Sequence, residues 1–109
     1  MPNAVDVKPA KWSAIEILFD DGEYSVISGI FGDAGIRCLG ERWNGEVNTH
    51  GFPSQGGNPT WHVVPKFPTI SLLHGVLDEL LRDSSRENRS YIEAVLRELG
   101  HQQVHLPTM

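Results

Sequence analysis

The sequence has little that would point to a disulfide framework, a membrane span or a secretion signal. It contains one cysteine, Cys38, in 109 residues, so no internal disulfide can form, and this favours a reducing cytoplasm. No apolar run is long enough to cross a bilayer. Residues 1–10 have neither the basic region nor the apolar region of a signal peptide. We therefore expect a cytoplasmic protein that does not associate with membranes.

Basic residues are also scarce. The chain has 9 lysine and arginine residues against 14 aspartate and glutamate residues, which gives a net charge of −5 with histidine neutral. A chain with this balance gains little free energy from neutralising phosphate groups. Its basic residues are also scattered along the sequence instead of forming one run. We therefore expect no binding to nucleic acid.

The composition is nevertheless that of a folded domain. Hydrophobic residues make up 39% of the chain and charged residues 21%, which is typical of a globular protein. A length of 109 residues is close to the commonest size of a single domain. We predict one domain over residues 11–100, between a flexible arm over residues 1–10 and a flexible tail over residues 101–109.

Alternating apolar and polar residues predict four strands, over about residues 11–20, 23–31, 36–43 and 60–64. Within the first strand, the alternation places Ile15, Ile17 and Phe19 on one face. The first two strands are separated by Asp21-Gly22, a pair typical of tight hairpins because both residues tolerate positive φ. Short turns of this kind between successive strands predict an antiparallel meander.

The C-terminal part of the sequence is predicted to be helical. Apolar residues at three- and four-residue spacing indicate helices over about residues 70–83 and 86–99. Thr69 is expected to be the N-cap of the first helix, and Gly100 is expected to follow the end of the second. Strands followed by helices predict an α+β fold, an antiparallel four-stranded meander (ββββ) with two C-terminal helices packed on one face of the sheet.

The longest segment without a periodic pattern runs from Trp43 to Trp61 and reads WNGEVNTHGFPSQGGNPTW. Loops longer than about 12–15 residues are uncommon in compact domains and are usually functional or disordered. The two tryptophans either contact a planar or sugar-like ligand or a protein partner, or they fold back and cover the end of the sheet. The predicted binding residues of this region are Arg42, Trp43, His50, Phe52, Trp61 and His62.

Signatures of catalysis and of metal binding are weak. Three histidines recur at twelve-residue intervals, which is unlike the short ligand spacings of zinc sites. His101 and His105 have i,i+4 spacing, but they follow the predicted end of the second helix. Cys38 lies in a predicted strand, where a buried, unreactive thiol is the usual outcome. We therefore expect no metal or other cofactor, and we assign no catalytic residue.

His74, Gly75 and Asp78 form a second candidate site on the first predicted helix. Glycine inside a helix costs about 1 kcal/mol relative to alanine, which is easiest to understand where another backbone comes close. That backbone belongs either to the sheet or to the same helix of a second subunit. A four-stranded sheet also leaves an edge or a face to protect. We therefore predict a homodimer with these three residues at a helix interface.

The sequence favours a small binding protein that uses the Trp43–Trp61 loop as its partner or ligand surface. A small-molecule-binding enzyme is a second hypothesis, and it predicts a pocket lined by Trp43, Trp61 and a histidine. The third hypothesis is an acidic inhibitor of the antitoxin or immunity-protein type, whose surface would complement that of a basic enzyme. No sequence motif decides between the three.

Overall fold

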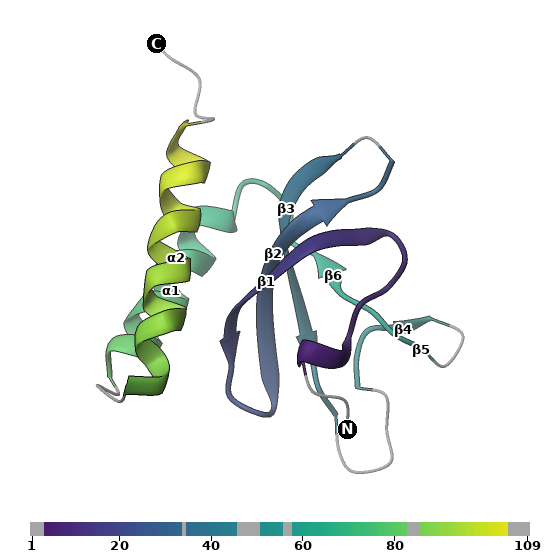
Figure 1. Ribbon diagram of the computed structural model, residues 1–109, viewed down its shortest axis with the longest axis horizontal. Helices are drawn as coiled ribbons and strands as arrows, with labels where there is room; N and C mark the ends of the chain where they lie inside the picture. Colours follow the sequence, from purple (N-terminus) through teal and green to yellow (C-terminus); the bar gives the residue numbers. More distant parts are fainter. Residues whose placement is uncertain (1–3, 34, 46–50, 56–57, 83–85, 105–109) are drawn as a thin grey trace. The chain divides into compact units, whose positions relative to one another are not determined.

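The computed structural model describes residues 4–33, 35–45, 51–55, 58–82 and 86–104, and the chain forms two compact units, residues 1–64 and 65–109. An antiparallel sheet with strand order β1-β2-β3-β6 precedes two C-terminal helices, which confirms the predicted α+β fold (Figure 1). The elements are η1 (Ala4–Asp6), β1 (Trp12–Asp20), β2 (Tyr24–Phe31), β3 (Ile36–Trp43), β4 (Ser54–Gln55), β5 (Asn58–Pro59), β6 (His62–Val63), α1 (Thr69–Leu81) and α2 (Arg86–Val104).

The turn between β1 and β2 is the hairpin predicted from Asp21-Gly22. Gly22 has a φ of 93°, a conformation that glycine adopts without a steric cost. The carboxylate of Asp20 accepts a hydrogen bond from the Gly22 amide at 2.9 Å, and that of Asp21 accepts one from the Tyr24 amide at 2.8 Å. The two aspartates thereby satisfy backbone donors that the tight turn leaves without a partner in the sheet.

β1 is an irregular edge strand. It has two register shifts against β2, the second of them between Ile17 and Phe19. Ile17 is paired with Ile27, whereas Phe19 is paired with Val26, so a β-bulge moves Phe19 to the other face of the sheet. The prediction that Phe19 shares a face with Ile15 and Ile17 is therefore wrong.

One face of the sheet is covered by a hydrophobic cluster centred on two tryptophans. Its buried members are Ala4, Val7, Trp12, Ile27 and Trp61, and the partly buried residues around them are Ile15, Ile17, Phe31, Cys38 and Val63. Ala4 and Val7 come from the segment that the sequence assigns to a flexible arm. The Trp61 indole Nε1 donates a hydrogen bond to the Val7 carbonyl oxygen at 2.8 Å. This bond fixes the N-terminal segment to the residue that ends the long loop.

Two strand glycines make room for the Trp12 ring. A Cβ added at Gly29 would lie 3.0 Å from Trp12 Cε3. A Cβ added at Gly40 would lie 2.9 Å from Trp12 Cη2 and 3.0 Å from Trp61 Cβ. Because a packed core adjusts little to added volume, a larger residue at either position would displace an indole ring.

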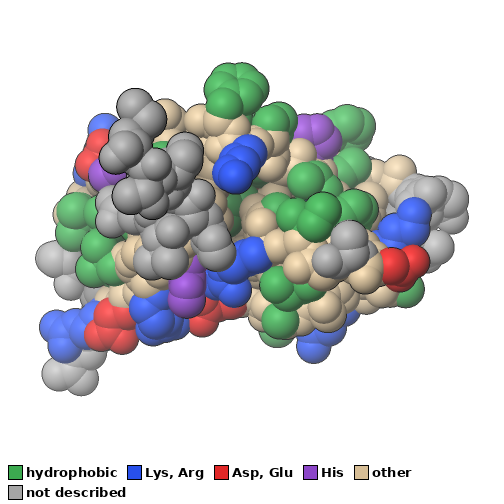
Figure 2. Space-filling model, turned by 90° about the horizontal axis from the view of Figure 1, so that it is seen from above, with side chains coloured by type: hydrophobic (Ala, Val, Ile, Leu, Met, Phe, Trp, Pro, Cys, Tyr) green, Lys and Arg blue, Asp and Glu red, His purple; other side chains and the backbone are tan. Residues whose placement is uncertain are grey.

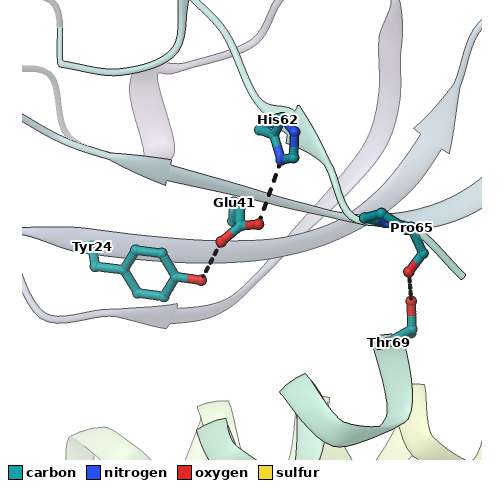
Figure 3. Close-up of polar contacts among 5 residues, drawn as sticks. All are labelled: Tyr24, Glu41, His62, Pro65 and Thr69. Carbon is teal, nitrogen blue, oxygen red and sulfur yellow. Dashed lines mark hydrogen bonds and ion pairs between the residues drawn. The ribbon is translucent and has the colours of Figure 1, made fainter. Parts of the chain in front are cut away.

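The second unit contains α1 and α2, which pack against each other. α1 begins at Thr69, and its N-cap residue is Pro68. The Thr69 hydroxyl donates a hydrogen bond to the Pro65 carbonyl oxygen at 2.9 Å (Figure 3), and no side chain caps the helix. The prediction of Thr69 as N-cap is therefore wrong, because its hydroxyl is engaged by the preceding turn.

The second helix is longer than the sequence predicts. α2 continues through Gly100 to Val104, so the prediction that Gly100 follows the helix end is wrong. The side chain of Gln102 donates a hydrogen bond to Glu98 across this position at 2.9 Å, and Leu99 is buried. These interactions offset the low helix propensity of glycine. Within the described part of the chain, no helix is both long and apolar enough to cross a bilayer.

Candidate functional site

The two tryptophans that bracket the long loop have different environments. The side chain of Trp61 is 3% exposed and belongs to the hydrophobic cluster, whereas that of Trp43 is 57% exposed. Glu41 pairs with His62, so Trp61 comes opposite Arg42. Trp43 follows Arg42 in β3 and therefore lies on the other face of the sheet. Trp61 therefore packs in the core, and Trp43 is free to contact another molecule.

Arg42 lies on the same side of the sheet as Trp61 and holds the end of the loop in place. It is 1% exposed, and its guanidinium lies 5.9 Å from the centre of the Trp61 ring. Arg42 Nη1 donates to the Thr60 carbonyl oxygen at 2.9 Å, and Nη2 donates to that of Trp43 at 3.4 Å. Burial lowers the pKa of Arg42. These contacts give this side chain a structural role.

Trp43 belongs to a line of four aromatic side chains that crosses the sheet, which we call the aromatic row: Phe19, Tyr24, Trp43 and Phe52. The ring centroids of Phe19 and Tyr24 are 6.5 Å apart, and those of Tyr24 and Trp43 are 4.7 Å apart with an interplanar angle of 47°. Trp43 and Phe52 form a β-bridge, with N–H···O distances of 2.7 and 2.8 Å. Phe52, at the end of the row, is 66% exposed.

Gly51 allows the chain to return to the end of β3. Its φ is 70°, and an added Cβ would collide with the Trp43 carbonyl oxygen and with Arg42 Nη2. Glycine is therefore required for the Trp43–Phe52 bridge. Beyond the bridge, β4 and β5 form a two-stranded hairpin within the segment that the sequence treats as one loop. His50 lies outside the described residues.

Asn44 fixes the end of the aromatic row to the β1–β2 turn. It is buried, and its amide N–H donates to the Glu23 carbonyl oxygen at 2.7 Å. Its side chain accepts a hydrogen bond from Ser25 Oγ at 3.1 Å and donates one to Asp20 at 3.3 Å. These contacts place the acidic turn, with the exposed residues Asp21 and Glu23, directly beside Trp43.

Glu41 connects the aromatic row to His62. Tyr24 Oη donates a hydrogen bond to Glu41 Oε1 at 2.8 Å, and His62 Nδ1 lies 3.4 Å from Glu41 Oε2 (Figure 3). Burial, the hydrogen bond to Glu41 and the charge of Glu41 together raise the pKa of Tyr24 above that of an ordinary phenol. The Tyr24 hydroxyl therefore remains a hydrogen-bond donor to Glu41 well into the alkaline range.

A cavity of about 230 Å³ lies beside these groups and is lined by Glu41, Arg42, Trp43, Phe52, Pro53 and His62. Of the six binding residues predicted from the sequence, Arg42, Trp43, Phe52 and His62 line this cavity, although the Arg42 guanidinium lies against the Trp61 ring. Trp61 itself belongs to the hydrophobic cluster. Small-molecule pockets usually measure about 300–1,000 Å³. The cavity is therefore smaller than a usual small-molecule pocket.

The candidate residues on α1 lie apart from this cavity in the sequence and are all exposed: His74, Gly75 and Asp78. An added Cβ at Gly75 would meet no described atom within 4 Å, so the structure shows no close backbone approach there.

Among the described residues, no group of three or more histidine, cysteine or acidic side chains is placed to hold a metal ion. His101 lies in α2, and His105 is outside the described residues.

Charged groups do not separate into regions of one sign on the face seen in Figure 2, where acidic and basic side chains are interspersed and hydrophobic side chains reach the surface in separate groups. The chain matches no protein-family model, no curated protein and no solved structure.

Proposed function

We propose that this chain acts by binding, and that its binding surface consists of the aromatic row together with Glu41 and His62. The observation that carries the proposal is the exposure of two neighbouring aromatic side chains, Trp43 and Phe52, which are 57% and 66% exposed. Fully burying one large apolar side chain is worth about 1.5–3 kcal/mol, so a partner that covers both gains substantial free energy. Tryptophan, tyrosine and phenylalanine are also enriched in the cores of protein interfaces.

The surface is held in place before any partner arrives. The Tyr24 ring, on β2, packs against the Trp43 ring. Two backbone hydrogen bonds between Trp43 and Phe52 fix these residues relative to each other. Asn44, the residue after Trp43, is hydrogen-bonded to Glu23 and Asp20 at the β1–β2 turn. A rigid surface loses little conformational entropy on binding, which leaves more of the contact energy as affinity.

A selection from a random peptide library displayed on phage tests this proposal. We expect the chain to enrich peptides whose binding is lost with Trp43→Ala or Phe52→Ala. Phe67→Ala is the matched control, because Phe67 is 90% exposed but lies outside the aromatic row. Circular dichroism and thermal melting verify that each variant is folded.

Enrichment of peptides that bind the Trp43→Ala, Phe52→Ala and Phe67→Ala variants equally well would contradict the proposal. Failure to enrich any peptide that depends on the aromatic row would contradict it too. A binding surface elsewhere on the chain would then have to be sought.

We also propose that the protein is a cytoplasmic homodimer, as its sequence suggests. The two bulges of β1 make edge-to-edge pairing of that strand unfavourable, so the dimer would use α1 and its exposed residues His74, Gly75 and Asp78. Light scattering at micromolar concentration is expected to give twice the mass of the 12.1 kDa chain. A Gly75→Ala variant should weaken the dimer, and a monomer mass for the unmodified protein would contradict it.

A further inference from the structure

We infer that the cavity beside the aromatic row receives the guanidinium group of an arginine side chain on a basic protein partner. This inference rests on the proposed function and names the chemistry of its ligand. The cavity combines a carboxylate, Glu41, with the exposed aromatic residues Trp43 and Phe52. A guanidinium can stack on an aromatic face and donate two hydrogen bonds to a carboxylate at the same time.

Two polar contacts within the described part of the chain orient the carboxylate of Glu41 without filling all of its acceptor positions. Tyr24 Oη holds Oε1 at 2.8 Å, so the side chain has a defined direction. Oε2 lies 3.4 Å from His62 Nδ1, which is longer than a good N–H···O hydrogen bond. A carboxylate offers about four lone-pair positions, and these two contacts leave room for the two donors of a guanidinium.

Arg42 also lines the cavity, but its guanidinium donates to the Thr60 and Trp43 carbonyl oxygens, and exposed carboxylates lie nearby. Asp21 and Glu23, on the β1–β2 turn that Asn44 holds beside Trp43, are both exposed. The chain as a whole has a net charge of −5 with histidine neutral. These charges attract a basic partner over a distance and raise its rate of encounter.

The size of the cavity is compatible with a single inserted side chain. Its volume of about 230 Å³ lies below the usual range of metabolite pockets, which is about 300–1,000 Å³. The same pairing of guanidinium and indole already occurs on the opposite face, where Arg42 lies 5.9 Å from the centre of the Trp61 ring. The partner's arginine would make the corresponding contact with Trp43.

Titration of the ¹⁵N-labelled full chain with the peptide acetyl-Gly-Ser-Arg-Ser-Gly-amide, followed by NMR at low salt, tests the inference. We expect the peptide to shift the Trp43 indole resonance and the amide resonances of Glu41 and Phe52. A citrulline peptide keeps the planar shape of the guanidinium but has no charge. It should bind at least about tenfold more weakly than the arginine peptide. A lysine peptide should also be weaker, because its ammonium neither stacks nor donates in a planar pair.

Variants of the chain complete the test. Glu41→Gln keeps an oxygen that can accept from Tyr24, and we expect it to weaken arginine binding about tenfold. Asp33→Asn is the matched control, since it removes one exposed negative charge at the β2–β3 turn, at the far end of β3 from Trp43. It should leave the affinity nearly unchanged.

Two results would overturn the inference while leaving the proposed function intact. One is equal binding of the arginine, lysine and citrulline peptides. The other is the enrichment from the phage library of peptides that require Trp43 and Phe52 but contain no arginine. Loss of all binding that depends on the aromatic row would instead contradict the proposed function itself.

Discussion

Replacing Trp61 by alanine is expected to lower the free energy of unfolding by about 3–5 kcal/mol, the usual cost of removing a buried aromatic side chain. Trp61 packs among Val7, Trp12 and Ile27, and its indole N–H is bonded to the Val7 carbonyl oxygen. The substitution would leave a cavity and a buried carbonyl without its donor. Denaturation by urea, followed by circular dichroism, measures the loss.

Two other variants show whether this cost reflects burial. Trp43→Ala removes the same side chain from an exposed position and should cost about 1 kcal/mol, chiefly through the lost contact with Tyr24. Trp61→Phe retains an aromatic ring and loses the hydrogen bond to Val7, so its cost should fall between those of the two alanine variants. Equal costs for Trp43→Ala and Trp61→Ala would contradict the assignment of one tryptophan to the core and the other to the surface.

Gly51→Ala is expected to lower the free energy of unfolding by about 2–5 kcal/mol and to disrupt the Trp43–Phe52 bridge. A left-handed conformation costs an alanine residue about 1–2 kcal/mol, and displacing a packed neighbour adds about 1–3 kcal/mol. Both costs apply here, because φ is 70° and the new Cβ would collide with the Trp43 carbonyl oxygen. The bridge is observed directly through the protection of the Trp43 and Phe52 amides from hydrogen exchange.

Gly32→Ala is the matched control for this variant. Gly32 has a φ of 76°, and an added Cβ there would have no neighbour within 4 Å, so only the cost of about 1–2 kcal/mol for the conformation applies. Amide protection of Trp43 and Phe52 should be unchanged in this control. The explanation fails if the two glycine variants lose the same stability, or if the bridge amides stay protected in Gly51→Ala.

Local sequence patterns predict the central sheet well because its hairpins are marked by turn residues. Asp21-Gly22 and the glycines between β2 and β3 define where the strands turn, and β3 has the bounds expected from its alternation. Counting outward from the pair Phe31–Ile36 places Tyr24 opposite Trp43. The core of the aromatic row could therefore have been predicted from turn positions, although no local sequence pattern marks Tyr24 or Glu41 as site residues.

Other features depend on interactions that the local sequence does not reveal. No glycine or proline marks the bulge between Ile17 and Phe19, so simple alternation assigns Phe19 to the wrong face. The different environments of Trp43 and Trp61 follow from the pairing of a two-residue strand, β6, which is too short to show a pattern. Gly100 is a strong local signal for a helix end, but burial of neighbouring Leu99 and the Gln102–Glu98 contact outweigh it.

The different environments of the three tryptophans also give the protein an intrinsic optical reporter. Trp12 and Trp61 are buried, so their fluorescence arises from an apolar environment, whereas Trp43 is in contact with water. A soluble quencher such as acrylamide therefore reaches Trp43 before the other two. The emission of Trp43 should shift to shorter wavelength when a partner covers the aromatic row. Unfolding would instead shift the emission of Trp12 and Trp61 to longer wavelength, because their side chains would become exposed to water. One spectrum of the unlabelled chain can thus distinguish occupation of the proposed surface from unfolding.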